Sequence, residues 1–144
     1  MYKRQAPDEA LLLGTDLVKD PVRLVAAYDD TSGTTAAFNR NVLRVLNQRL
    51  AADFRPERFE HRAVWDPDNE WVEMRLRSTA DQRVRLPALD MDLDLAAGEE
   101  IRTEISAKFT RSRVEADLAA AGLAVRWWWE DPAGDYALSL SGPA

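Results

Sequence analysis

Glu104 and Ser106 stand two positions apart in the segment 98–109, where polar and apolar residues alternate. In an extended strand, alternate side chains share a face, so Arg102 and Lys108 join this pair on a polar face. The other face is apolar and is expected to pack: Ile101, Thr103, Ile105, Ala107 and Phe109. A carboxylate accepts hydrogen bonds and a hydroxyl can donate or accept, so the pair could bind one small polar ring. The alternative is a half-buried strand with a merely solvated polar face, which is common in antiparallel sheets.

The composition limits the other chemistry that the chain could perform. With 144 residues, 46% hydrophobic and 31% charged, it is typical of one soluble globular domain with a real core. The net charge of −6 argues against a nucleic-acid partner. Cysteine is absent and His61 is the single histidine, which excludes thiolate chemistry and a two-histidine metal site. No apolar run reaches transmembrane length and no signal peptide is visible, so we expect no membrane partner and a cytoplasmic protein.

Three aspartates, Asp90, Asp92 and Asp94, have the spacing of the first ligands of a calcium loop. The glycine and the glutamate that such a loop requires are replaced by Leu95 and Ile101. Alternation with Leu89, Met91, Leu93 and Leu95 instead predicts a strand with one buried and one acidic face. We therefore expect no metal site.

The other segments predict a mixed α/β fold. The apolar run 10–17 is typical of a strand buried on both faces of a parallel sheet, and Thr15 and Asp16 at its end could face a ligand or form a turn. The remaining elements are expected to be helices at about 20–30, 34–52 and 112–122, a β-hairpin over 59–77, and strands at 82–86, 89–95, 123–129 and 135–140.

Several segments together resemble one enzyme family, the histidine-specific, S-adenosylmethionine-dependent N-methyltransferases of ergothioneine biosynthesis. The similarity runs from about Pro7 to Leu140 and is carried by Leu12-Leu13-Gly14-Thr15-Asp16-Leu17-Val18-Lys19-Asp20, Ala27-Tyr28-Asp29-Asp30, Thr35-Ala36-Ala37-Phe38-Asn39-Arg40-Asn41-Val42-Leu43, Gly98-Glu99-Glu100 with Thr103 to Phe109, and Asp131 to Leu138. The resemblance implies an α/β fold: the C-terminal part of a Rossmann-like methyltransferase sheet with an inserted α+β substrate-binding domain. Residues 1–19 and 110–144 would belong to the sheet, and residues 20–109 to the substrate-binding domain.

The resemblance also implies a substrate pocket on matching positions. Tyr28 matches the tyrosine that contacts the backbone end of bound histidine. Glu104 and Ser106 match the pair that hydrogen-bonds the imidazole ring, and Met74 matches an apolar residue lining that ring. Glu73, on the opposite face of its strand from Met74, is expected to contribute much less. No residue of this chain is expected to be catalytic, because methyl transfer to an amine depends mainly on positioning.

The family's cofactor, S-adenosylmethionine, is bound by a half of the enzyme that lies upstream of Leu11. No Gly-x-Gly occurs in this chain, so its cofactor-binding residues are unknown and expected upstream. We therefore interpret the chain as a C-terminal fragment that is inactive by itself, and residues 1–5, which do not resemble the family, as a spurious start.

The expected reaction is methylation of the histidine α-amine to give hercynine, by a protein that is monomeric at full length and has a small molecule as its partner. Two alternatives stay open: a methyltransferase for another aromatic amine, such as a tryptophan derivative, and a non-catalytic amino-acid-binding module. Glu104 with Ser106 favours imidazole over indole, because indole has one N–H donor and no ring acceptor.

Overall fold

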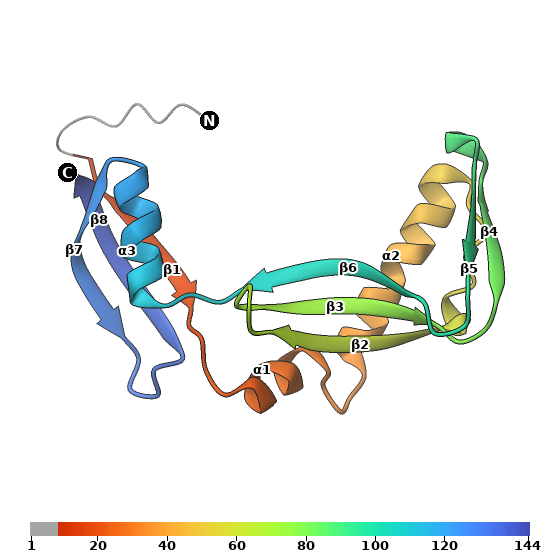
Figure 1. Cartoon of the computed structure of the whole chain (residues 1–144), viewed down its shortest axis with the longest axis horizontal. Coiled ribbons are helices and arrows are strands. Elements are labelled where there is room, and N and C mark those ends of the chain that lie inside the picture. The colour runs from red at the N-terminus through yellow and green to blue at the C-terminus, as the bar shows by residue number, and fades with distance from the viewer. Residues whose placement is uncertain (1–8) are drawn as a thin grey trace. The chain divides into compact units, whose positions relative to one another are not determined.

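The computed structural model describes residues 9–144 (Figure 1). The interpretation of residues 1–5 as a spurious start concerns positions outside this range. The chain divides into two compact units, one formed by residues up to Asp20 together with Ala107–Ala144, and the other by Pro21–Ser106. Both units mix helices with mainly antiparallel strands, so the fold is mixed α/β.

The first unit is a three-stranded sheet with one helix, α3 (Arg111–Ala120). The strand order is β1 (Leu11–Asp16), β8 (Tyr136–Pro143), β7 (Leu123–Glu130), and both pairings are antiparallel. The helix begins one residue earlier than expected, because the Thr110 hydroxyl caps it by accepting from the Arg113 backbone N–H at 3.3 Å.

The expectation that β1 is buried on both faces of a parallel sheet is wrong within the described residues. β1 pairs antiparallel with β8, and Leu12 is 61% exposed. An uninterrupted apolar run does not identify its partner strand, because the pairing depends on a segment more than a hundred residues away. The parallel contact found here is one bridge, between Leu17 and Phe109.

One face of this sheet is covered by α3, and the other carries exposed apolar side chains. Directly paired residues share a face, so the register gathers one set of exposed apolar side chains: Leu12, Trp127, Trp129, Tyr136 and Leu138. Trp127 and Trp129 stack there with ring centroids 6.3 Å apart. The opposite face packs against α3 around the buried residues Val114, Leu118 and Leu123. On the open face, a Cβ at Gly14 would collide with the Tyr136 side chain as it is placed, so a larger residue there would require this ring to move.

The second unit holds two helices, two short 3₁₀ helices and two sheets. Its elements are α1 (Pro21–Tyr28), α2 (Thr34–Leu50), η1 (Pro56–Arg58), β2 (Phe59–Asp66), β3 (Trp71–Ser78), β4 (Gln82–Leu86), η2 (Pro87–Leu89), β5 (Met91–Leu95) and β6 (Glu100–Ala107). The sheet order is β2-β3-β6, and β4 pairs with β5 separately. The predicted helix pair and the β2–β3 hairpin are confirmed.

Local sequence explains where the helices start. Pro21 occupies the first position of α1, where a missing N–H costs nothing. Asp30 accepts from the backbone N–H groups of Thr34 and Thr35 at 3.1 and 2.7 Å, which satisfies two donors at the start of α2. The hydrogen bonds from Ser32 and Thr35 hold the pKa of Asp30 well below its usual range.

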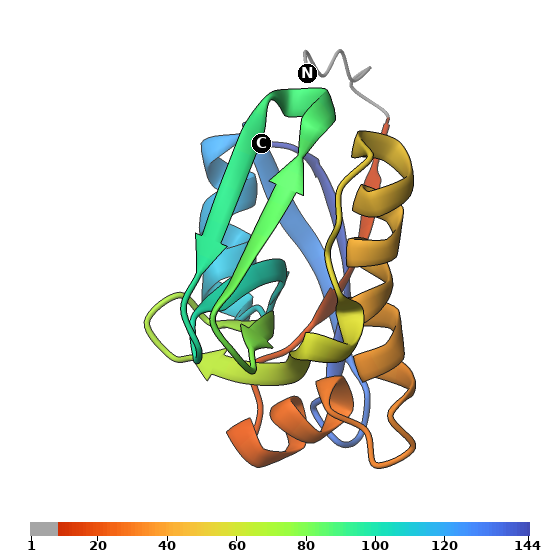
Figure 2. The same cartoon turned by 90° about the vertical axis from the view of Figure 1, so that its right-hand side faces the viewer.

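The hydrophobic core of this unit joins α2 to both sheets. Its buried residues are Leu43, Phe54, Phe59, Leu76, Val84, Leu86 and Leu95. Figure 2 shows the β4–β5 hairpin standing beside α2, which the shared core explains. β6 begins at a bulge in which Gly98 donates to the Ser78 carbonyl and Ser78 donates to the Glu99 carbonyl, both at 2.8 Å. Gly98 has a φ of +87°, which favours glycine at this position.

The aspartate segment is only partly as expected. β5 starts at Met91, while Asp90 ends η2 in a left-handed conformation. The apolar face is not all buried, since Leu89 and Met91 are 54% and 45% exposed. Arg83 pairs with Asp92 at 2.6 Å, and in the part of the chain that the structure describes no group of three acidic or histidine side chains could hold a metal. Among residues 9–144, no helix is long and apolar enough to cross a membrane.

The exposed apolar face of the first unit makes self-association expected for the 144-residue chain alone. Replacing Trp127 and Trp129 together with lysine should shift the oligomeric state towards monomer with little loss of thermal stability, because both rings are about half exposed or more. Light scattering at increasing protein concentration measures this.

Trp128 provides the matched control, because it packs on the opposite face beside Val114 and Leu118. Trp128→Lys should lower the free energy of unfolding by roughly 1–3 kcal/mol and leave self-association in place. Monomeric behaviour of the unaltered chain at all concentrations would contradict the prediction.

Candidate functional site

Two of the predicted site residues are in direct contact. Tyr28 is the last residue of α1, and its hydroxyl donates to the Ser106 Oγ of β6 at 2.7 Å. The two residues are 78 positions apart in the chain, and both side chains are half-buried. The polar strand positions and the end of the first helix therefore belong to one local site.

Glu104 lies on the same strand, two residues before Ser106, and its side chain is exposed. Within residues 9–144 the Glu104 carboxylate makes no hydrogen bond or ion pair. Both oxygens can therefore accept from a ligand without first breaking a contact in the described chain.

Met74 lies in the central strand of this sheet and is 4% exposed. Its carbonyl accepts from the Thr103 hydroxyl at 2.9 Å, which fixes it next to the residue preceding Glu104. The structure thus brings Tyr28 and Ser106 together and places Met74 in the neighbouring strand.

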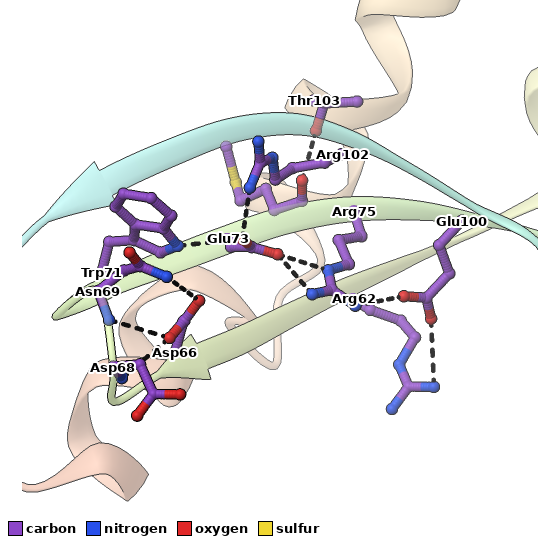
Figure 3. A network of polar contacts seen from close by, with 11 residues as sticks. Arg62, Asp66, Asp68, Asn69, Trp71, Glu73, Arg75, Glu100, Arg102 and Thr103 are labelled. Atoms are coloured by element: carbon purple, nitrogen blue, oxygen red, sulfur yellow. Dashed lines mark hydrogen bonds and ion pairs between the residues drawn. The ribbon is translucent and has the colours of Figure 1, made fainter.

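Glu73 has a larger structural role than its sequence position indicates. Its side chain is 3% exposed and forms the centre of the network in Figure 3. Arg102 Nη1 donates to Glu73 Oε1 at 2.8 Å, Trp71 Nε1 donates to the same oxygen at 3.0 Å, and Arg75 Nε donates to Oε2 at 2.7 Å. Arg75 also donates to Glu100 at 2.8 Å. Glu73 therefore ties β3 to β6 just before Glu104.

The charges in this network shift the pKa of Glu73. The hydrogen bond from Arg102 is the largest cause, and with those from Arg75 and Trp71 it outweighs burial and lowers the pKa to about 2. The same contacts raise the pKa of the Arg75 guanidinium, Glu100 being the largest cause. Glu73 is thus a buried carboxylate that stays ionised and is fully paired.

The candidates at the end of β1 have structural partners. Asp16 forms ion pairs with Lys108 at 2.8 Å and with Lys19 at 2.7 Å. Burial alone would raise the pKa of Asp16, but the hydrogen bonds from these lysines lower it below its ordinary value. Lys108, expected on the solvated face with Glu104, is instead fully buried; it follows the end of β6 at Ala107 and belongs to the other unit.

A pocket in the second unit lies apart from these residues. One cavity of about 300 Å³ is lined by Asp53, Arg55, Arg58, Asp81, Gln82 and Arg83. Tyr28, Glu104 and Ser106 have no part in it. Of these three side chains, Glu104 is exposed and Tyr28 and Ser106 are half-buried.

Comparison with known proteins identifies the family. A family model described as histidine-specific methyltransferase, SAM-dependent, matches residues 1–143. The chain belongs to this family. Over 135 residues it is 58% identical to the histidine N-alpha-methyltransferase of Mycolicibacterium smegmatis and 56% identical to that of Mycobacterium tuberculosis. Each match covers 94% of this chain and 42% of the relative, so the chain spans about two fifths of their length.

The family's cofactor does not fit the residues described here. A Rossmann-type site needs a strand, a glycine-rich turn and a helix in succession. β1 is followed by Leu17-Val18-Lys19-Asp20 and then α1, without glycine, and Leu17 is buried.

The Glu73 network predicts a specific pH dependence of stability. Because folding lowers the pKa of Glu73 from 4.5 to about 2, its contribution is present above about pH 4.5 and is lost as the pH falls towards 2. Glu73→Gln should destabilise the protein near neutral pH, and the gap to the unaltered protein should narrow over this window. Urea unfolding at successive pH values measures the gap.

Glu60→Gln is the matched control. Glu60 lies on β2 of the same sheet, is exposed, and has no partner among residues 9–144. Its substitution should leave a small difference that does not vary with pH. A gap for Glu73→Gln that stays constant between pH 6 and pH 2 would refute the assigned role.

Proposed function

We propose that this chain forms the histidine-binding part of an S-adenosylmethionine-dependent enzyme that methylates the α-amine of L-histidine, giving hercynine in ergothioneine biosynthesis. Residues 9–19 and 110–144 would then be the C-terminal part of a Rossmann-like methyltransferase sheet. Residues 20–109 would be its inserted substrate-binding domain, a range whose bounds nearly match those of the unit Pro21–Ser106. The whole enzyme would be a cytoplasmic monomer with a small-molecule substrate and no nucleic-acid or membrane partner.

The contact between the Tyr28 and Ser106 hydroxyls carries this proposal. A tyrosine that binds the backbone end of histidine and a serine that binds its ring must lie within the length of one amino acid. The 2.7 Å distance between their oxygens makes the two hydroxyls neighbours, so a single small ligand could reach both. Family membership over residues 1–143 and 58% identity to a histidine N-alpha-methyltransferase support the same assignment.

The chemistry of Glu104 and Ser106 suits a neutral imidazole. Ser106 Oγ accepts from Tyr28, and a serine hydroxyl is a group that can hydrogen-bond an unprotonated ring nitrogen as a donor. An ionised Glu104 accepts from the ring N–H on the other side. The two residues together select a ring with one donor and one acceptor.

Tyr28 would contribute to catalysis by placing the α-amine. Nucleophilic attack by an amine requires its unprotonated form at near-attack distance from the methyl carbon, which is a task of positioning. S-adenosylmethionine supplies the methyl group when bound by the rest of the enzyme.

Two other functions would use the same residues differently. An enzyme for a tryptophan derivative would leave the Ser106–Glu104 pair without a matching ring acceptor, since indole offers only an N–H. A non-catalytic amino-acid-binding module would bind histidine and transfer nothing. Assaying methyl transfer to both amino acids with the full-length protein separates all three.

Glu104→Ala in the full-length protein should weaken histidine binding about tenfold to a hundredfold, because it removes a charge-assisted hydrogen bond worth roughly 1.5–3 kcal/mol. Ser106→Ala should weaken binding less, since the lost bond is between neutral groups. Isothermal titration calorimetry with histidine measures both changes. Amines with an apolar aromatic ring should lose less affinity.

Glu60→Ala is again the suitable comparison, because this exposed carboxylate lies on the same sheet without a described partner. Glu73 is unsuitable, since its loss would leave Arg75 and Arg102 without their buried partner. Equal losses of histidine affinity for Glu104→Ala and Glu60→Ala would show that the Glu104 assignment is wrong.

A further inference from the structure

A buried asparagine on α2 connects three strands of the sheet that carries the site. Asn39 is 3% exposed. Its Nδ2 donates to the Arg75 carbonyl of β3 at 3.2 Å and lies 2.9 Å from His61 Nδ1 of β2. Its Oδ1 accepts from the Thr103 hydroxyl of β6 at 2.6 Å. One amide group therefore contacts all three strands.

These contacts fix both the amide orientation and the protonation of His61. The Arg75 carbonyl can only accept, so the Asn39 nitrogen must face it and the same nitrogen donates to His61 Nδ1. His61 Nε2 lies 2.7 Å from the Tyr28 carbonyl, which also can only accept. The imidazole must then carry its hydrogen on Nε2 and accept at Nδ1. His61 is thus neutral and both of its nitrogens are engaged.

We infer that Asn39 and His61 are positioning residues for histidine binding, an inference that rests on the function proposed above. The series Thr103–Asn39–His61–Tyr28 joins the residue before Glu104 to the backbone of the tyrosine. Tyr28 is held at both ends, by His61 at its carbonyl and by Ser106 at its hydroxyl. Because α1 ends at Tyr28, its carbonyl has no N–H of a following helical turn as a partner. His61 Nε2 takes that place.

The network sets the distance between the two ends of the substrate site. Glu104 and Ser106 lie on β6, whereas Tyr28 arrives from α1, and Asn39 links the two through β2. Because the Asn39 amide and the His61 ring have fixed donor and acceptor roles in these contacts, losing either side chain leaves buried polar groups unpaired and the strand end free to shift. Loss of a link should therefore weaken histidine binding in variants that still fold.

The first test compares two asparagines of α2 in the full-length protein. Asn39→Leu keeps the side-chain size and removes all three contacts. Asn47→Leu removes a comparable pair of bonds, because Asn47 Nδ2 donates to the Phe54 carbonyl at 2.8 Å and Oδ1 accepts from the Phe54 N–H at 2.9 Å. Asn39→Leu should raise the Kd for histidine about tenfold, whereas Asn47→Leu should leave it within about twofold.

The second test uses the protonation state deduced for His61. A glutamine amide offers one donor and one acceptor, as the neutral imidazole does, whereas leucine offers neither. His61→Gln should bind histidine within about threefold of the unaltered protein, and His61→Leu about tenfold more weakly. Calorimetry with S-adenosylmethionine provides the second readout, because its Kd should not change in either variant.

The outcomes separate this inference from the proposed function. If the unaltered full-length protein binds no histidine, the proposed function is wrong and the inference fails with it. If it binds histidine and the folded His61→Leu and Asn39→Leu variants bind equally well, the inference alone is overturned. The inference is also overturned if Asn47→Leu weakens binding as much as Asn39→Leu, or if His61→Gln is no better than His61→Leu. Should Asn39→Leu fail to fold, the His61 pair decides.

Discussion

The amide of Asn39 meets the requirement that a buried polar group be hydrogen-bonded. Almost fully buried, it uses both N–H groups and its oxygen, and each contact reaches a different strand of the β2-β3-β6 sheet. Helix α2 therefore cannot slide along this sheet without leaving donors or acceptors unpaired. The apolar contacts around Leu43 and Leu76 are not directional, whereas the hydrogen bonds of the amide specify one alignment of α2 on the sheet. The positions of Tyr28 and β6 both follow from that alignment.

Sequence periodicity was sufficient to predict the helices and strands but not to predict which strands pair with each other. The helix pair and the β2–β3 hairpin follow from local signals such as Asp20-Pro21 and the turn at residues 66–69. The partner of β1 does not, because β8 lies more than a hundred residues away and any apolar strand could pair with Leu11–Leu13. Lys108 shows the same limit: alternation predicted a solvent-exposed position, yet Lys108 is fully buried and forms an ion pair with Asp16.

For the candidate site, only the resemblance indicated residues that are distant in the sequence and lie close together in the structure. The Tyr28–Ser106 contact spans 78 residues, and no local pattern indicates it. Glu73 and Asn39 were missed for a related reason, because a polar residue on a strand or helix is by default assigned to solvent. A signal did exist for Asn39: it precedes Arg40 in a helix whose Leu43 and Leu46 face the core, four and seven positions later. A polar residue in that stripe predicts a buried hydrogen-bond network.

The bulge at Gly98 has a consequence for how this strand can evolve. Its extra residue, placed opposite Ser78, sets whether odd or even positions of β6 point to a given side of the sheet. Inserting or deleting one residue between Gly98 and Glu104 would reverse that alternation, and the side chains of Glu104 and Ser106 would both move to the opposite face of the sheet. Descendants of this chain can therefore exchange side chains along the strand far more readily than they can change its length.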